Sequence, residues 1–120
     1  MRIFKISWFA RFASKEGITD NELKETVRLL EAGQADANLG GNVYKMRVAR
    51  SGEGKSGGYR VIVLFKSGDR TFYMYGFAKS DRGNIGQNEL AKLKRQANSL
   101  FSMSDAQITA ALKEGILSEI

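Results

Sequence analysis

Three residue types are missing from this chain of 120 residues, which contains no cysteine, no proline and no histidine. Without cysteine there can be no disulfide framework and no cysteine nucleophile, and without cysteine or histidine there is no Cys/His zinc site. Without histidine there can be no Ser-His-Asp triad and no histidine general base. These absences exclude triad hydrolases, cysteine enzymes and small disulfide-rich domains.

Long apolar runs are missing as well. The longest, Val61–Phe65, is far shorter than the roughly 20 residues that a membrane-spanning helix needs. Arg2, Lys5 and Arg11 interrupt the apolar N-terminal stretch, so it lacks the pattern of a signal peptide. Hydrophobic residues make up 42% of the chain and charged residues 27%, which is the balance of a globular domain. We therefore expect one domain over residues 1–120, located in the cytoplasm and without a membrane partner.

Positive charge is abundant but unevenly distributed. The chain has 19 Lys and Arg residues against 13 Asp and Glu residues, a net charge of +6. Residues 44–95 hold twelve basic and four acidic residues, whereas residues 1–43 are neutral and residues 96–120 carry a net −2. A basic middle segment predicts a polyanionic partner, most often nucleic acid. A lysine-rich solvated surface would explain the charge equally well, but the share of arginine favours phosphate recognition, because the planar guanidinium suits phosphate oxygens.

The hydrophobic pattern predicts strands in a run, followed by helices in a run. We expect strands over residues 3–9, 43–50, 59–65, 70–78 and 116–120, and a loop over residues 34–42. A short helical turn is expected within residues 9–17, and a helix over residues 88–101. Capping boxes at Thr19/Glu22 and Ser104/Gln107 predict two further helix starts. This order indicates an α+β fold with an N-terminal strand and helix (or helical pair), an antiparallel β-meander and C-terminal helices.

The glycine-rich residues 51–58 imitate two phosphate-binding motifs. Gly54-Lys55-Ser56 resembles the end of a P-loop, but Ala49 stands where that motif needs its first glycine. The stretch also matches G-x-G-x-x-G, yet both motifs need a helix directly afterwards, and residues 59–65 have the pattern of a strand. We therefore expect no nucleotide cofactor.

Alternation in residues 44–49 predicts a half-buried strand with a basic face, because Lys45 and Arg47 point to the side opposite the apolar residues. The ends of neighbouring antiparallel strands meet at one end of a sheet, and the glycine-rich loop would lie above that end. Five cations would then converge on one patch: Lys45, Arg47, Lys55, Arg60 and Lys79. Tyr59, Tyr73 or Tyr75 would lie near its rim. The alternative is that these cations point separately to solvent and that the tyrosines only pack the sheet.

Three strings of the chain resemble the RelE/ParE superfamily of toxins from toxin-antitoxin systems. They are V-Y-K-M-R-V from residue 43, K-S-G-G-Y-R-V-I from residue 55 and Y-G-F-A-K-S-D-R from residue 75. The combination of K-S-G-G-x-R with G-F-A-K is similar to the RelE/HigB-like subgroup. The start of the chain and residues 35–41 resemble that subgroup too, so the resemblance covers nearly the whole chain. It implies a small RelE-like fold and a cognate antitoxin as partner.

The resemblance also implies an activity, the cleavage of mRNA in the ribosomal A site by basic residues without a metal. By this resemblance, the expected catalytic residues are Lys45, Arg47, Lys55, Arg60 and Lys79, and the expected RNA contacts are Arg50, Tyr59, Tyr75 and Arg82. Asp69 and Asp81 are isolated in the sequence, so no carboxylate cluster suggests a two-metal nuclease.

Two alternatives stay open. Ile85 falls roughly where some family nucleases place a catalytic tyrosine, so no tyrosine can be assigned that role. The superfamily also contains gyrase inhibitors that do not cut RNA. A ParE-like gyrase-inhibiting toxin and a non-catalytic RNA-binding module are therefore the alternatives to a ribosome-dependent mRNA endonuclease.

Overall fold

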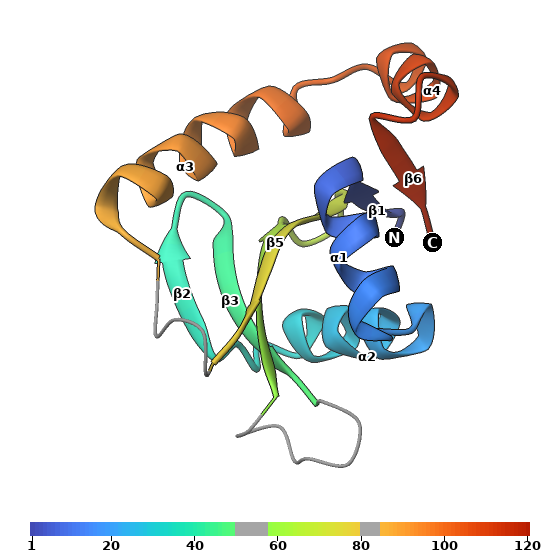
Figure 1. Cartoon of the computed structure of the whole chain (residues 1–120). Coiled ribbons are helices and arrows are strands. Elements are labelled where there is room, and N and C mark those ends of the chain that lie inside the picture. Colours follow the sequence, from blue (N-terminus) through green and yellow to red (C-terminus); the bar gives the residue numbers. More distant parts are fainter. Residues whose placement is uncertain (50–57, 80–84) are drawn as a thin grey trace.

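A mixed β-sheet forms the centre of the protein (Figure 1). The computed structural model describes residues 1–49, 58–79 and 85–120. Within these residues the strands are β1 (Ile3–Ile6), β2 (Ala37–Gly40), β3 (Val43–Val48), β4 (Tyr59–Phe65), β5 (Thr71–Ala78) and β6 (Leu117–Glu119). The helices are α1 (Ser7–Glu16), α2 (Asp20–Glu31), α3 (Gln87–Phe101) and α4 (Asp105–Lys113). In this part of the chain, no helix combines the length and the apolar character that a membrane crossing requires.

The sheet has the strand order β2-β3-β4-β5-β1-β6. Strands β2 to β5 form an antiparallel meander, and β1 pairs with β5 in parallel, with Ile3 opposite Thr71. Strand β6 then pairs with β1 in antiparallel fashion. The predicted α+β fold is confirmed, and the terminal strands extend the predicted meander into a larger sheet.

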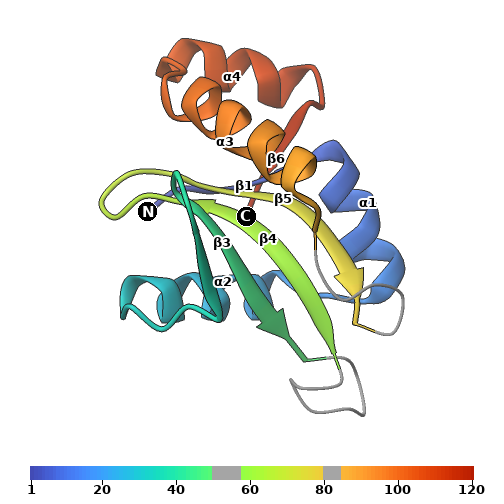
Figure 2. The same ribbon diagram turned by 90° about the vertical axis from the view of Figure 1, so that its left-hand side faces the viewer.

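Helices cover both faces of the sheet, α1 and α2 on one side and α3 and α4 on the other (Figure 2). Each side has its own core. Phe9 of α1 and Leu23 of α2 pack with one set of sheet residues, and Leu93 of α3 and Ile108 of α4 pack with the other. Strand β4 is buried along its whole length because it lies between these two layers. That explains its continuous apolar run, which is typical of strands covered on both faces.

The N-terminal strand is shorter than predicted. The sequence predicted a strand through Phe9, but β1 ends at Ile6 and α1 begins at Ser7. Phe9 and Ala13, four residues apart, are both buried against the sheet, which is the spacing of a helix face. The buried residues after Ile6 therefore follow the helical period and not the alternation of a strand.

The expectation of a loop over residues 34–42 was wrong, because Ala37–Gly40 forms the edge strand β2. Its polar and glycine-rich sequence gives no strand pattern, and backbone pairing with β3 holds it in place. Gly40 and Gly41 have positive φ angles of 86° and 60° at the turn into β3. Lys94 of α3 lies directly against both glycines, where any side chain would crowd it. The turn thus permits a close approach of α3 that a larger residue would prevent.

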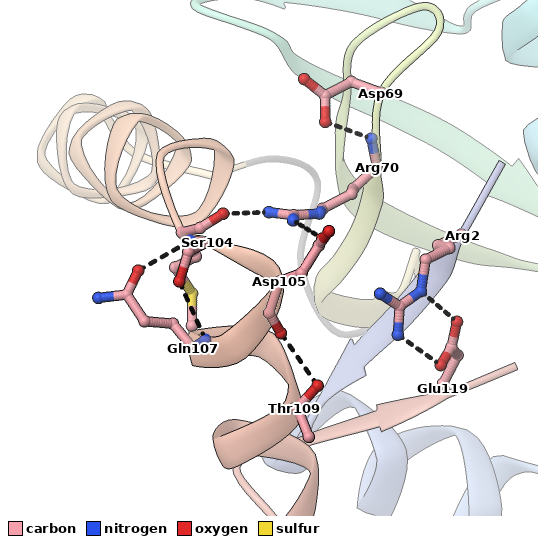
Figure 3. A network of polar contacts seen from close by, with 9 residues as sticks. Arg2, Asp69, Arg70, Ser104, Asp105, Gln107, Thr109 and Glu119 are labelled. Carbon is pink, nitrogen blue, oxygen red and sulfur yellow. Dashed lines mark hydrogen bonds and ion pairs between the residues drawn. The ribbon is translucent and has the colours of Figure 1, made fainter.

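Polar contacts hold α4 and β6 against the rest of the protein, as Figure 3 shows. The capping box of Ser104 and Gln107 begins α4, as the sequence predicted. The Arg70 guanidinium donates to the Met103 carbonyl oxygen (2.6 Å) and to the Asp105 carboxylate (2.7 Å). Arg2 binds both carboxylate oxygens of Glu119, and this contact holds the pKa of that carboxyl below its usual value. The start of β5 and strand β1 thereby anchor α4 and β6.

Candidate nucleic-acid interface

Arg47, Arg60 and Lys79 lie at one end of the meander. In the register of the sheet, Arg47 of β3 stands opposite Arg60 of β4, and Arg60 stands opposite Phe77 of β5. Lys79 follows β5 directly, and its backbone N–H donates to the Gly58 carbonyl oxygen (3.4 Å). The end of β3, the beginning of β4 and the end of β5 therefore meet, as the meander predicted.

Three of these cations share one face of the sheet. Met46 and Val48 belong to the core under α1 and α2, so the alternation of β3 directs Lys45 and Arg47 to the opposite face. Arg60 lies between Tyr59 and Val61, which also belong to that core, and it therefore shares the face of the two β3 cations. The basic face of β3 is confirmed.

The side chain of Arg47 has a defined partner. Its Nε atom lies 2.8 Å from Oδ1 of Asp36, and the Arg47 side chain stays 49% exposed. Asp36 directly precedes β2, and Ala37 at the start of that strand is opposite Lys45. Edge strand β2 thus brings a carboxylate to the second strand of the basic face. Sequence reasoning missed Asp36, because its position depends on a strand that has no recognisable pattern.

Arg60 is 5% exposed, an unusual position for a guanidinium. Burial reduces screening by water, so a charge at this position acts more strongly on a neighbouring anion than a surface charge does. The register also places it directly across from a second arginine. Asp36 lies beside this second arginine, so the face combines two opposed guanidinium groups with one carboxylate.

The predicted tyrosines lie on different faces. Tyr75 is opposite Ile62, on the face of the arginines, and is partly exposed. Tyr59 is 3% exposed on the other face, where its hydroxyl donates to Glu16 of α1 (2.8 Å). The structure therefore brings Tyr75, and not the ring of Tyr59, to the basic face.

Tyr73 is also remote from the predicted patch. It is buried under α2, and its hydroxyl donates to the Leu23 carbonyl oxygen (2.6 Å). Burial raises the pKa of the Tyr73 hydroxyl far above its usual value. Of the three tyrosines named as alternatives for the rim, Tyr75 is thus the one on the basic face. Tyr73, two residues earlier, lies on the other face because the bulge between Ile62 and Val63 in the β4–β5 pairing changes which β5 residues share a face.

An aromatic residue that the sequence analysis did not assign lies beside this face. Trp8 of α1 stacks on Tyr75, with ring centroids 4.5 Å apart, and Tyr75 contacts Phe77 at 6.1 Å. Phe77 is the register partner of Arg60, so a row of rings connects the arginine pair to α1. Ile85 also lines the cavity beside Trp8 and Tyr75.

Three predicted residues, Arg50, Lys55 and Arg82, lie outside the described residues. The described Asp and Glu side chains form no group of three or more that would hold a metal ion. The structure thus assembles Lys45, Arg47 and Arg60 on one face, with Lys79 at the same end of the sheet.

Comparison with known protein families agrees with the small α+β fold. Residues 1–120 match the family model described as the RelE toxin of the RelE/RelB toxin-antitoxin system. Among curated proteins, no sequence matches this chain. Because the family match covers every residue, the chain belongs to the RelE toxin family, whose members are paired with a cognate antitoxin.

Proposed function

We propose that this toxin is a ribosome-dependent mRNA endonuclease that uses arginine and lysine side chains without a metal. The observation that most supports this function is the pairing of Arg47 with Arg60, with Lys45 on the same face. Arg47 is paired with Asp36 but its side chain stays half-exposed, and Arg60 lies directly opposite it on β4. A phosphate group above the two strands would bind both guanidinium groups, since guanidinium groups form strong charge-assisted hydrogen bonds with phosphate.

The cleavage uses the RNA's own 2′-hydroxyl as nucleophile. The 2′-oxygen forms a bond to phosphorus, and the bond from phosphorus to the 5′-oxygen breaks. A base removes the proton of the 2′-hydroxyl and an acid gives a proton to the 5′-oxygen, so the products are a 2′,3′-cyclic phosphate and a 5′-hydroxyl. The phosphorane between these states carries additional negative charge, and we assign its stabilisation to Arg47 and Arg60. Cations held on rigid strands need no reorganisation when that charge develops.

Lysine side chains are the groups we assign to proton transfer. An ammonium can give a proton to the 5′-oxygen and an amine can take one from the 2′-hydroxyl, and the flexible stem of lysine lets it reach either atom. Lys45 and Lys79 are candidates from the described residues, and Lys55 is proposed from the sequence. Tyr75 is the aromatic side chain that we assign to contact with a base.

RNA contacts for Arg50 and Arg82 are also part of this proposal, on the strength of the sequence. Tyr59, the third residue expected from the sequence, is left out, because its ring is buried on the other face against α1. Arg50 and Arg82 would contact the phosphate backbone and so fix the register of the RNA.

The test is to express the chain and map the 5′ ends of cellular transcripts. We expect cuts at fixed positions within codons of translated mRNAs, and we expect them to disappear in the Arg47→Ala/Arg60→Ala variant. Arg28→Ala is the matched control, because Arg28 is an exposed arginine on α2, which covers the other face of the sheet. A DNA-damage response without cuts would instead indicate gyrase inhibition. Neither effect would indicate an RNA-binding module, and both results would contradict the proposal.

A further inference from the structure

A cavity of about 450 Å³ lies between α1 and the end of β5. Trp8, Arg11 and Lys15 of α1 line one side of it, and Gly76 and Ala78 of β5 line the other. Its volume is in the usual range of sites for small ligands and cofactors. We call it the β5-edge cavity.

The backbone of β5 turns hydrogen-bonding groups toward this cavity. Lys79 donates to the Gly58 carbonyl oxygen (3.4 Å), and hydrogen-bonded pairs alternate with non-hydrogen-bonded pairs along antiparallel strands. In the register of β4 and β5, Gly76 and Ala78 therefore occupy non-hydrogen-bonded positions, and their N–H and C=O groups point away from β4. Strand β1 pairs with β5 as far as Tyr73, so no strand among the described residues takes up these groups. They can bind a ligand in the cavity.

Aromatic rings form much of the wall of the β5-edge cavity. Trp8 is 38% exposed and lines the cavity together with Phe12, Tyr75 and Phe77. The indole stacks on Phe12, with ring centroids 5.4 Å apart, and on Tyr75 at 4.5 Å. These contacts hold the indole in place and leave part of it exposed. Aromatic side chains held in this way are the surfaces on which proteins stack the unpaired bases of RNA.

Two cations and one carboxylate complete the lining. Arg11 and Lys15 lie one helical turn apart on α1 and are exposed, and neither forms an ion pair within the part of the chain that the structure describes. The Glu16 carboxylate accepts a hydrogen bond from the Tyr59 hydroxyl (2.8 Å). A carboxylate can also accept from the exocyclic amino group of cytosine or adenine. The charges thus favour a ligand that carries phosphate and an amino-bearing base.

The cavity adjoins the proposed RNA site. Phe77 lines the cavity and is the register partner of Arg60. Tyr75, which also lines the cavity, lies two residues away on the same strand, a distance of about 7 Å along β5. An RNA strand with one phosphate at the opposed arginines can therefore place a neighbouring base in the cavity.

We propose that the β5-edge cavity binds one unstacked nucleotide of mRNA, next to the phosphate that Arg47 and Arg60 bind. Its base would stack on Trp8, and the edge of the base would meet the backbone groups of β5. The two cations of α1 would bind its phosphates. The cavity would thereby select the base beside the cut. The inference rests on the proposed function, because it needs the opposed arginines to bind the phosphate that is cleaved.

Trp8 is the only tryptophan of the chain, so its fluorescence reports on this cavity without any cleavage. The probe is a short single-stranded oligo(A) with methylated 2′-oxygens, which cannot be cut because its nucleophile is blocked. We expect saturable quenching of Trp8 fluorescence, because a base would stack on the indole. An abasic strand with the same number of phosphates should not quench it, and neither should duplex RNA, whose bases are paired.

Arg11→Ala/Lys15→Ala keeps the fluorescent reporter and removes the two cations. We expect it to weaken oligo(A) binding by about tenfold or more at low salt. Lys24→Ala/Arg28→Ala is the matched control, because these exposed residues have the same spacing on α2 and do not line the cavity. Its affinity should stay within about twofold of the wild type. Absent quenching in the wild type, equal quenching by the abasic strand or the duplex, or equal affinity of the two double variants would overturn the inference.

Cleavage on programmed ribosomes then identifies which RNA occupies the cavity. The wild type should cut mRNAs that differ only in the base beside the cut at different rates. Trp8→Leu should reduce these differences, and Trp8→Phe should keep them because it retains an aromatic ring. Wild-type rates that do not depend on this base would contradict the assignment to mRNA. An equal loss on all mRNAs in Trp8→Leu would also contradict it and would place ribosomal RNA in the cavity. A wild-type chain whose fluorescence is quenched but which cuts no mRNA would contradict the proposed function alone, because the quenching would still support a nucleotide site.

Discussion

The environment of Arg60 resembles that of a side chain that stabilises charge in a transition state. It is buried, it carries a full charge, and it stands opposite a second arginine. We expect Arg60→Ala to slow the chemical step by about 10²- to 10³-fold, the loss typical of removing one group that stabilises a transition-state charge. Ribosome binding should change only a few-fold, because the lost interaction is made in the transition state. Single-turnover rates on programmed ribosomes and a binding assay measure the two effects separately.

Because Arg60 is buried, a slow variant needs a check for folding. Thermal unfolding of Arg60→Ala provides it, and Arg47→Ala provides a second variant at a half-exposed position where truncation leaves no cavity. Arg28→Ala on α2 is the control for loss of one positive charge. An Arg60→Ala variant that cleaves as fast as the wild type would place the active site elsewhere.

How far the sequence predicts the site depends on the residue. Lys45 and Arg47 were predictable, because period-two alternation beside an apolar stripe determines their face. Asp36 was not, because it reaches Arg47 only through an edge strand that is stabilised by backbone pairing and leaves no side-chain pattern. Trp8 was not either, since residues 3–9 were interpreted as one strand, and a strand gives no reason for Trp8 to contact Tyr75.

At the scale of elements, Gly76 permits α1 to pack on β5. A Cβ atom at Gly76 would overlap the ring of Phe12, which lies directly on the strand. We expect Gly76→Ala to lower the free energy of unfolding by about 1–3 kcal/mol, as overpacking of a core commonly does. Chemical denaturation measures this loss.

The control for this prediction restores the space on the helix. Phe12→Leu replaces the ring with a smaller aliphatic side chain, so the double variant Gly76→Ala/Phe12→Leu should be more stable than the sum of the two single losses predicts. Strictly additive losses would show that the Phe12 ring is not what the new methyl group meets.

Arg70, directly before β5, connects this strand to the start of α4. It donates to the Met103 carbonyl and to Asp105, at the start of α4, and its side chain is 14% exposed. We expect Arg70→Leu to lower the free energy of unfolding by about 1.5–3 kcal/mol, the usual range for hydrogen bonds of a charged group. Hydrogen exchange should show the largest loss of protection in α4. Arg28→Ala, which removes an exposed pair within α2, should leave both measurements unchanged.

The elements differ in how well the sequence predicts them. The predicted starts of α2 and α4 are correct, because a capping box is a local interaction with a clear residue signature. The pairing of β1 with β5 in parallel was not predictable, since it joins segments about 68 residues apart with no local signal. The burial of Val43 was not predictable either. Val43 lies on the same face of β3 as Lys45 and Arg47, but it packs in the core under α3 and α4 and is therefore apolar.

At the scale of the whole molecule, the fold shows where part of the positive charge of residues 44–95 lies. The basic segment of residues 44–95 includes the opposed arginines of β3 and β4 and also Lys92 and Arg95, which line a cavity beside α3. The excess of positive charge in the sequence thus corresponds to cations on the side of the sheet that α3 and α4 cover, which is also the side of the proposed RNA site.

The absence of histidine is also a property of the whole molecule, and it predicts how cleavage depends on pH. No side chain of the protein has an ordinary pKa near 6.5, so the proposed cleavage has no histidine source for a bell-shaped profile centred near neutrality. Carboxylates titrate below this range in their ordinary state and arginines above it, which leaves a lysine or a tyrosine as the base. A lysine base must lose its proton first, so we expect single-turnover cleavage on programmed ribosomes to rise from pH 6 to pH 9. Lys45→Met should flatten that rise if Lys45 is the base, whereas Tyr75→Phe should leave it unchanged. A wild-type rate that does not change over this range would contradict a lysine base.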